Sequence, residues 1–189
     1  MSAKRRVVFL DRDGVLNRAF PEASTTRPPL CLDELELLPG VPEALGRLEG
    51  AGFALVVVTN QPDVARGRQT RAAVEAINTR LREQLPLLDV FACYHDTGDR
   101  CECRKPKPGL LLAAAEKWDL DLASAVLIGD RWSDVVAARS AGCRGVLIDT
   151  PFSHADRCSP DYTAADITAA VDWILAVAHA GAPPGGGRS

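Results

Sequence analysis

Two aspartates separated by one residue follow a short apolar run near the start of the chain. The run is 7–10, and the aspartates are Asp11 and Asp13, with Gly14 directly after them. Apolar, partly β-branched residues predict a buried strand, so both carboxylates leave the sheet at one end, and the glycine permits a tight turn. An isolated Asp-x-Asp-Gly is also common as a plain turn or helix cap. In this position the pair suits a Mg²⁺ site with an aspartate nucleophile.

Two later apolar runs end in polar residues in the same way. Residues 53–58 lead into Thr59 and Asn60, and residues 125–128 lead through a glycine into Asp130. In a parallel sheet the carboxyl ends of the strands meet along one edge, where ligands bind. We therefore expect these side chains to lie beside the first pair, with Asp130 as a further oxygen ligand for Mg²⁺.

The rest of the chain alternates between strand and helix patterns. Continuous apolar runs predict strands, and apolar residues at helical spacing predict the helices between them. This alternation predicts an α/β protein with a Rossmann-like, mostly parallel sheet and helices on both faces. The predicted strands are 7–10, 53–58, 90–94, 125–128 and 145–148, and the predicted helices are about 41–50, 70–85, 108–118, 134–141 and 164–179.

Three cysteines and a histidine lie close together between positions 93 and 103. The pattern is C-x-H-x5-C-x-C, formed by Cys93, His95, Cys101 and Cys103. A coincidental group of buried thiols is the alternative, but four such ligands in one polar loop fit a closed, structural Zn²⁺ site. The loop runs directly into 104–108, so the metal would fix the segment that carries Arg104 and Lys105. The other cysteines, Cys31, Cys143 and Cys158, are interpreted as ordinary thiols.

The motifs together resemble those of the haloacid dehalogenase superfamily of aspartate-dependent phosphatases, over about residues 7–150. In chain order they are Asp11-x-Asp13-Gly14, Thr59-Asn60, Lys105 and Gly129-Asp130-x-x-x-Asp134. The resemblance implies that Asp11 attacks the substrate phosphorus, while Asp13 protonates the leaving alkoxide and then activates the hydrolytic water. It also implies that Mg²⁺ is held by Asp11, the backbone carbonyl of Asp13 and Asp130. Thr59, Asn60 and Lys105 would bind the phosphoryl oxygens.

The C-x-H and C-x-C-R-K-P segments narrow the resemblance. They are similar to those of the D-glycero-D-manno-heptose 1,7-bisphosphate phosphatases and the related histidinol-phosphate phosphatases. The heptose family implies removal of the 7-phosphate from a small sugar bisphosphate in carbohydrate metabolism, with Arg104 in substrate recognition. We also expect Arg131 to reach the substrate.

Alternatives to the heptose substrate remain open. Residues 20–30 lack the aromatic and histidine-bearing substrate loop of the heptose family, and the five residues between His95 and Cys101 resemble the shorter loop of the histidinol-phosphate enzymes. A zinc-stabilised binding module without catalysis is the alternative from another class. Arg66, Arg68 and Arg71 are either contacts to a second phosphate or solvated surface residues.

Length and composition limit the remaining possibilities. The 189 residues fit one domain, predicted as 1–180, with a disordered Gly/Pro tail at 181–189. A net charge of -3 argues against nucleic acid as a partner, and no apolar run is long enough to span a membrane. We expect a cytoplasmic monomer without a large cap domain, whose polar, proline-bearing segment 18–38 shapes the mouth of the site. We expect the protein to bind a small phosphorylated metabolite in this site.

Overall fold

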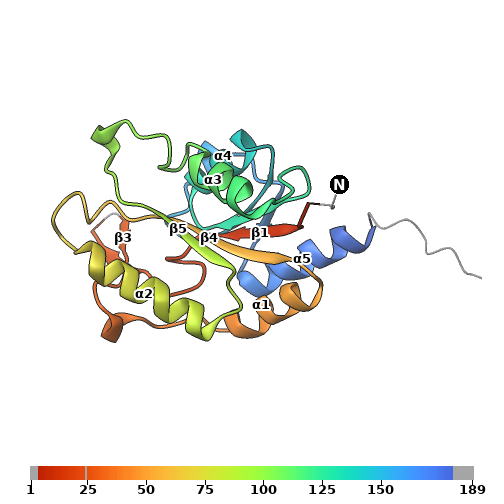
Figure 1. Ribbon diagram of the computed structural model, residues 1–189, viewed down its shortest axis with the longest axis horizontal. Helices are drawn as coiled ribbons and strands as arrows, with labels where there is room; N and C mark the ends of the chain where they lie inside the picture. Colours follow the sequence, from red (N-terminus) through yellow and green to blue (C-terminus); the bar gives the residue numbers. More distant parts are fainter. Residues whose placement is uncertain (1–3, 24, 181–189) are drawn as a thin grey trace, which may run out of the picture.

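The computed structural model describes residues 4–23 and 25–180, and its centre is a six-stranded sheet (Figure 1). Every neighbouring pair of strands in it is parallel, and the spatial order is β5-β4-β1-β6-β7-β8. The strands are β1 (Val7–Leu10), β4 (Ala54–Asn60), β5 (Asp89–Cys93), β6 (Val126–Gly129), β7 (Arg144–Ile148) and β8 (Tyr162–Ala164). The α/β fold with a parallel sheet is thus confirmed.

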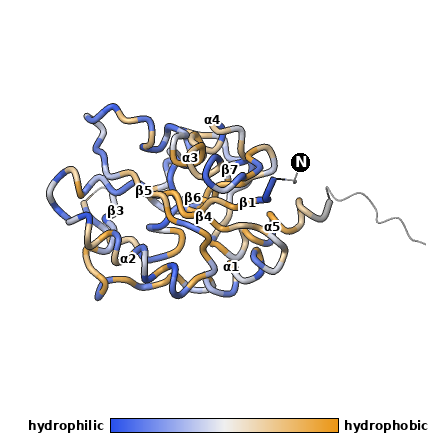
Figure 2. Tube along the Cα trace, in the orientation of Figure 1, coloured by the Kyte–Doolittle hydropathy of each residue, from blue (hydrophilic) through white to orange (hydrophobic). Residues whose placement is uncertain are grey.

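Helices cover both faces of the sheet. They are α1 (Val41–Gly50), α2 (Arg71–Gln84), α3 (Gly109–Trp118), α4 (Trp132–Ser140) and α5 (Ile167–Ala180). In Figure 1, α3 and α4 lie above the sheet, and α1, α2 and α5 lie below it. Two separate apolar clusters, one on each face, result from this arrangement. Apolar residues gather along the central strands (Figure 2), and β1 and β6 are apolar along their whole length because both of their faces are buried.

The order of the strands in the sheet indicates where a ligand would bind. The chain builds β1, β4 and β5 outward in one direction and then returns to lay β6, β7 and β8 on the other side of β1. The order of strands therefore reverses beside β1, and such a switch point leaves a crevice at the carboxyl ends of the strands. Asp11, Thr59 and Asp130 lie at the ends of the three adjacent strands β1, β4 and β6.

Two short elements depart from the sequence-based predictions. Residues 162–164 form the edge strand β8, so the last helix begins at Ile167 and not at 164. Asp166 directly precedes this helix, and its carboxylate accepts a hydrogen bond from the Ala169 backbone N–H (2.9 Å). Three residues are too few to show strand alternation. Within the polar segment 18–38, β2 (Phe20–Glu22) and β3 (Thr25–Arg27) form an antiparallel hairpin. The predicted tail lies outside the described residues.

Short 3₁₀ turns, Leu32–Glu34, Thr97–Asp99 and Ala155–Arg157, complete the elements. Among the described residues, no helix is long and apolar enough to cross a membrane.

The central strand β6 offers a test of the packing. Leu127 is fully buried, whereas Leu112 on α3 keeps 47% of its surface exposed. Leu127→Ala should lower the free energy of unfolding by about 2–5 kcal/mol, because it leaves a cavity between β6 and the helices above it. Leu112→Ala is the control and should change it by less than about 1 kcal/mol. Urea unfolding measures both, and equal effects would contradict the assigned core.

Candidate active site

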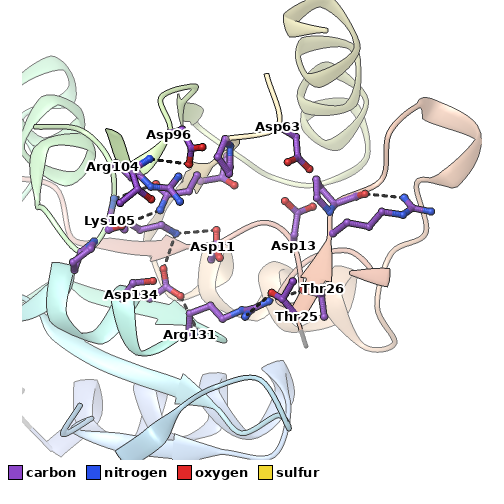
Figure 3. Close-up of a pocket in the computed structure, with 18 of the residues that line it drawn as sticks. Asp11, Asp13, Thr25, Thr26, Asp63, Asp96, Arg104, Lys105, Arg131 and Asp134 are labelled. Atoms are coloured by element: carbon purple, nitrogen blue, oxygen red, sulfur yellow. Dashed lines mark hydrogen bonds and ion pairs between the residues drawn. The ribbon is translucent and has the colours of Figure 1, made fainter. Parts of the chain in front are cut away.

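A buried lysine joins two carboxylates at the carboxyl end of the sheet (Figure 3). Lys105 Nζ lies 2.9 Å from Asp11 Oδ1 and 2.6 Å from Asp134 Oδ1, and only 3% of the lysine is exposed. Lys105 Nζ also donates a hydrogen bond to the Val58 carbonyl at 2.7 Å. Asp130 lies beside this group, and oxygens of Asp11, Asp130 and Asp134 all fall within 4.8 Å of one another.

Asn60 places Lys105 in the site. Its Oδ1 accepts a hydrogen bond from the Lys105 backbone N–H (3.1 Å), and its Nδ2 donates to the Lys105 carbonyl (3.0 Å). The end of β4 therefore holds the backbone of a residue 45 positions later in the chain. The family resemblance implies that Asn60 binds phosphate, which stays a prediction; in this structure its side-chain amide positions Lys105.

Buried negative charge dominates the electrostatics of the site. Burial, together with the charges of Asp134 and Asp13, raises the pKa of Asp11 to about 6 despite the nearby Lys105. Burial and the charges of Asp11 and Asp134 raise the pKa of Asp130 well above its ordinary value. Burial alone would lower the pKa of Lys105, but the two carboxylates outweigh it and raise that pKa. One lysine does not balance three buried carboxylates.

These groups fit a divalent cation. Three ionised carboxylates face the Lys105 ammonium and the Arg131 guanidinium, whose Nε lies 3.4 Å from Asp130 Oδ2, so one negative charge remains unbalanced, and hard oxygen ligands are those that Mg²⁺ prefers. Asp130 Oδ1 is buried and has no hydrogen-bond partner among the described residues, so an acceptor is available. Gly14 has a φ of +86°, and a Cβ there would fall against the Asp130 carboxylate. A glycine at this turn therefore leaves room for the acid.

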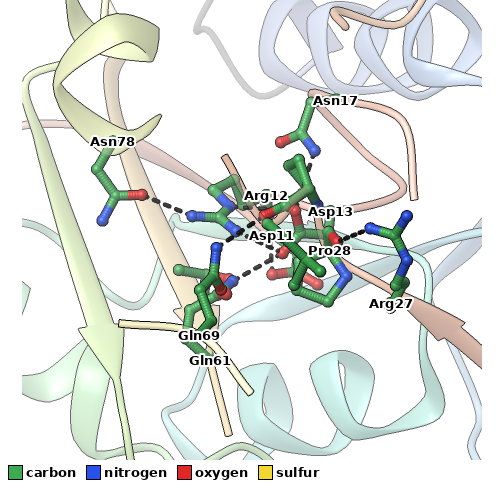
Figure 4. A network of polar contacts seen from close by, with 12 residues as sticks. Asp11, Arg12, Asp13, Asn17, Arg27, Pro28, Gln61, Gln69 and Asn78 are labelled. Atoms are coloured by element: carbon green, nitrogen blue, oxygen red, sulfur yellow. Dashed lines mark hydrogen bonds and ion pairs between the residues drawn. The ribbon is translucent and has the colours of Figure 1, made fainter. Parts of the chain in front are cut away.

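Asp13 lies at the same edge, but its carboxylate faces other partners (Figure 4). It accepts hydrogen bonds from Arg12, Asn17 and Gln61 and does not join the cluster of three acids. The Asp13 carboxylate is thus not one of the three acids that could hold a metal here, and binding of Mg²⁺ by the Asp13 backbone carbonyl stays a prediction. Asp134, which belongs to the fourth motif but was not predicted as a site residue, takes the third place among the carboxylates.

A pocket of about 900 Å³ opens above these groups. The hairpin β2–β3 forms one wall, where Arg131 Nη2 donates to Thr26 Oγ1 at 2.5 Å and Nη1 contacts the Phe152 carbonyl at 3.4 Å. The loop after β5 forms the opposite wall, where Arg104 Nη1 donates to the His95 carbonyl at 3.2 Å. All the residues predicted to bind phosphate or substrate line this pocket: Thr59, Asn60, Arg104, Lys105 and Arg131.

The other arginines divide into two groups. Arg66 and Arg68 line the pocket but are paired with Asp96 and Glu22, respectively. Arg71 does not line it and instead stacks on Tyr94, with its guanidinium carbon 4.7 Å from the ring centroid. Thr25, Thr26 and Arg100 also line the pocket, and no motif singles them out because their place depends on the hairpin and on the loop after β5.

The cysteine and histidine cluster forms beside the pocket. Cys93 Sγ lies 3.7 Å from Cys101 Sγ and 3.0 Å from Cys103 Sγ, and His95 Nδ1 lies 3.6 Å and 3.3 Å from Cys93 and Cys103. A tetrahedron with Zn–S bonds of about 2.3 Å places its sulfurs about 3.7 Å apart. The four side chains predicted as zinc ligands thus meet with nearly the spacing that such an ion needs.

The fold and the acid–lysine group at its switch point define a haloacid dehalogenase-like hydrolase, and residues 102–170 match the family model described as HAD-hydrolase-like. The chain is 38% identical to D-glycero-D-manno-heptose-1,7-bisphosphate 7-phosphatase of Thermosynechococcus vestitus, over 90% of this chain and 95% of the relative. It is also 38% identical to the corresponding enzyme of Pseudomonas aeruginosa, over 77% of this chain and 82% of that one.

A solved structure shows the same similarity. The D,D-heptose 1,7-bisphosphate phosphatase of B. bronchiseptica, complexed with magnesium and phosphate, aligns with a TM-score of 0.76 and 31% identity, over 92% of this chain and 99% of that one. The chain belongs to the family of these heptose-bisphosphate phosphatases and is a phosphoric monoester hydrolase. It is therefore not a non-catalytic binding module.

The raised pKa values predict how a divalent cation acts on stability. Between its ordinary value of 3.8 and about 6, Asp11 binds a proton in the folded protein but not in the unfolded chain. Its contribution to the free energy of unfolding without metal therefore falls as the pH rises through this window. Mg²⁺ binds the deprotonated acids, so the rise in Tm on adding it should be small at about pH 5 and about 5–10 °C at about pH 7.5.

Thermal unfolding with and without Mg²⁺ at the two pH values measures this effect. Asp130→Asn should reduce the rise at about pH 7.5, because it removes one ligand charge. Equal rises at both pH values, or a full rise in the variant, would contradict the assignment of the metal to these acids.

Proposed function

We propose that this protein is a Mg²⁺-dependent phosphatase that removes the 7-phosphate of D-glycero-D-manno-heptose 1,7-bisphosphate. The relatives that match most of the chain carry this activity in their names. The observation that carries the mechanism is the group of Asp11, Lys105 and Asp130 at the floor of an open pocket. A nucleophile, a phosphate-binding cation and a metal-binding acid meet there.

In this mechanism Asp11 is the nucleophile. One of its carboxylate oxygens forms a bond to phosphorus while the bond from phosphorus to the sugar oxygen breaks, and Asp13 gives that oxygen its proton. A water then attacks the aspartyl-phosphate, Asp13 takes a proton from this water, and inorganic phosphate leaves. Asp11 and Asp13 both line the pocket, so both can reach a bound phosphate ester.

The remaining groups bind and orient the phosphate. Lys105 places a positive charge beside the attacking carboxylate. The Thr59 oxygen accepts a hydrogen bond from Gln61 (2.9 Å), which leaves the threonine hydrogen free to donate to a phosphoryl oxygen. When bound by Asp11, Asp130 and the Asp13 carbonyl, Mg²⁺ would neutralise charge on the transferring group.

Arginines on both walls suit the second phosphate of such a substrate. Arg104 lies on the side of the loop after β5 and Arg131 on the side of the hairpin. We propose that these two residues recognise the sugar and its distal phosphate, because guanidinium groups bind phosphate in a bidentate manner.

A substrate panel with an Asp11 variant tests the proposal. The heptose 1,7-bisphosphate should be hydrolysed with the highest kcat/KM among several sugar phosphates and histidinol phosphate. Asp11→Asn should lower the rate by about 10³-fold or more, because an amide is a poor nucleophile. Asp33→Asn, at an exposed acid outside the pocket, is the control and should change the rate by less than about 2-fold.

Two results would overturn the proposal in different ways. Preference for histidinol phosphate would overturn the substrate but leave the reaction class intact. Retained Mg²⁺-dependent phosphate release by Asp11→Asn would overturn the mechanism.

We also propose that Cys93, His95, Cys101 and Cys103 hold a structural Zn²⁺. Cys93 ends β5, the other three candidate ligands lie in the loop that follows, and Lys105 comes two residues after Cys103. The backbone there is further held by Lys107, whose Nζ donates to the Cys101 carbonyl at 2.8 Å. Thiolate ligands require reduced cysteines, and all six cysteines are free thiols, which supports the reducing cytoplasm as the location.

Removing one zinc ligand should loosen the loop that carries Arg104 and Lys105. Cys101→Ser should abolish the binding of about one Zn²⁺ per chain, lower the Tm and reduce kcat/KM by about 10-fold or more. Cys31→Ser, at an exposed thiol outside the cluster, is the matched control and should change none of these. Metal analysis and thermal unfolding measure the effect, and a zinc-free protein with full activity and unchanged Tm would contradict the structural role.

A further inference from the structure

The Asp13 carboxylate is surrounded by hydrogen-bond donors (Figure 4). Its Oδ1 accepts from Arg12 Nε (3.2 Å) and Asn17 Nδ2 (3.0 Å), and its Oδ2 accepts from Arg12 Nη2 (3.1 Å) and Gln61 Nε2 (2.7 Å). Donors on both oxygens fix the orientation of the carboxyl group. The shortest of the four bonds comes from Gln61.

All of these donors lie behind Asp13. Arg12, Asn17 and Gln61 are fully buried and do not line the pocket, whereas Asp13 does and keeps 16% of its side chain exposed. Any effect of Arg12 and Asn17 on a bound substrate therefore passes through Asp13, whereas Gln61 can act through Asp13 or through Thr59, and only the first path depends on the leaving group.

The donors are themselves anchored to other elements. Arg12 Nη1 donates to Asn78 Oδ1 on α2 at 2.9 Å, and the Gln61 backbone N–H donates to the Cys93 carbonyl at the end of β5 at 2.7 Å. Gln61 Nε2 also contacts Thr59 Oγ1 at the end of β4. Three elements thus fix the direction in which the Asp13 carboxylate points.

Stability alone does not account for the two amides. Gln61 Oε1 and Asn17 Oδ1 are buried and have no hydrogen-bond partner in residues 4–23 and 25–180. An unpaired buried acceptor destabilises a fold, and an apolar side chain of similar size would avoid this effect. Both residues nevertheless direct their N–H groups at Asp13, which indicates that the donor is what the site uses.

We propose that Gln61 is a positioning residue for Asp13, which holds the carboxylate where it delivers its proton to the leaving oxygen. This inference rests on the proposed role of Asp13 as the general acid. Gln61 touches neither the substrate nor the metal site. Through Asp13 it affects both proton transfers, the one to the leaving oxygen and the later one from the hydrolytic water.

The test compares two leaving groups. A sugar alkoxide needs a proton as it leaves, whereas 4-nitrophenolate is stable without one, so misplacing the acid slows only the first reaction. The value of kcat/KM covers the steps through transfer of the phosphoryl group to Asp11 and excludes the later hydrolysis. Comparing kcat/KM for the best sugar phosphate and for 4-nitrophenyl phosphate therefore isolates the proton delivery.

Gln61→Met keeps the length of the side chain and removes the donor. It should lower kcat/KM for the sugar phosphate by about 10–100-fold and for 4-nitrophenyl phosphate by less than about 3-fold. Gln69→Met is the matched control, because Gln69 is also a buried glutamine with an unpaired Oε1, but its amide donates to the Pro29 carbonyl (2.9 Å) and not to Asp13. It should change both substrates by the same factor.

The possible outcomes separate the proposals. Equal losses for both substrates in Gln61→Met, or no loss for either, would overturn the positioning role. Gln61→Asn, whose amide is too short to reach Asp13 Oδ2, gives the same comparison if the methionine variant does not fold. Asp13→Asn should show the same selective loss to a larger degree. If it shows no selectivity between the leaving groups, the general-acid role in the proposed function fails instead.

Discussion

The ion pairs of Lys105 with Asp11 and Asp134 are the interaction on which the site depends. An ammonium group and two carboxylates at the end of a buried sheet lose most of their hydration, and only close mutual contact offsets that loss. The lysine therefore needs an accurately placed backbone. Asn60 supplies part of that placement, and the loop after β5 that holds the cysteines supplies the rest. Removing either support would leave buried charges without partners.

The sheet and the loops contribute different parts of the chemistry. Adjacent strands of the parallel sheet deliver Asp11, Thr59 and Asp130 to one edge, which every protein of this architecture can do. The hairpin β2–β3 and the loop after β5 then form the two walls of the pocket. These walls carry Arg104 and Arg131, the arginines that we propose recognise the substrate.

Much of the fold was predictable because its strands are buried on both faces. Continuous apolar runs such as 53–58 mark strands without ambiguity, and the polar residues that follow them mark the edge where ligands bind. Strand β8 and the hairpin were missed, since each strand has only three residues and depends on tertiary contacts. Tyr162 of β8, for example, stacks on Trp173 at a centroid distance of 5.2 Å.

The meeting of the candidate catalytic residues at one edge of the sheet was also predictable, but the contacts that support them were not. Asp11, Lys105 and Asp130 have types and spacings that indicate phosphoryl transfer. The pairing of Asn60 with the Lys105 backbone and of Gln61 with Asp13 joins residues more than 40 positions apart, and no local pattern reveals such contacts. Their importance becomes visible only when the hydrogen bonds of each buried polar group are followed.

The formation of an acyl phosphate on Asp11 is the central claim of the mechanism. Quenching the enzyme during turnover and reducing it with borohydride converts an aspartyl-phosphate to homoserine, which mass spectrometry of the peptides locates. The mechanism predicts homoserine at position 11 when substrate and Mg²⁺ are both present, and none when substrate is omitted. Turnover without any modified aspartate, or modification at another position, would contradict it.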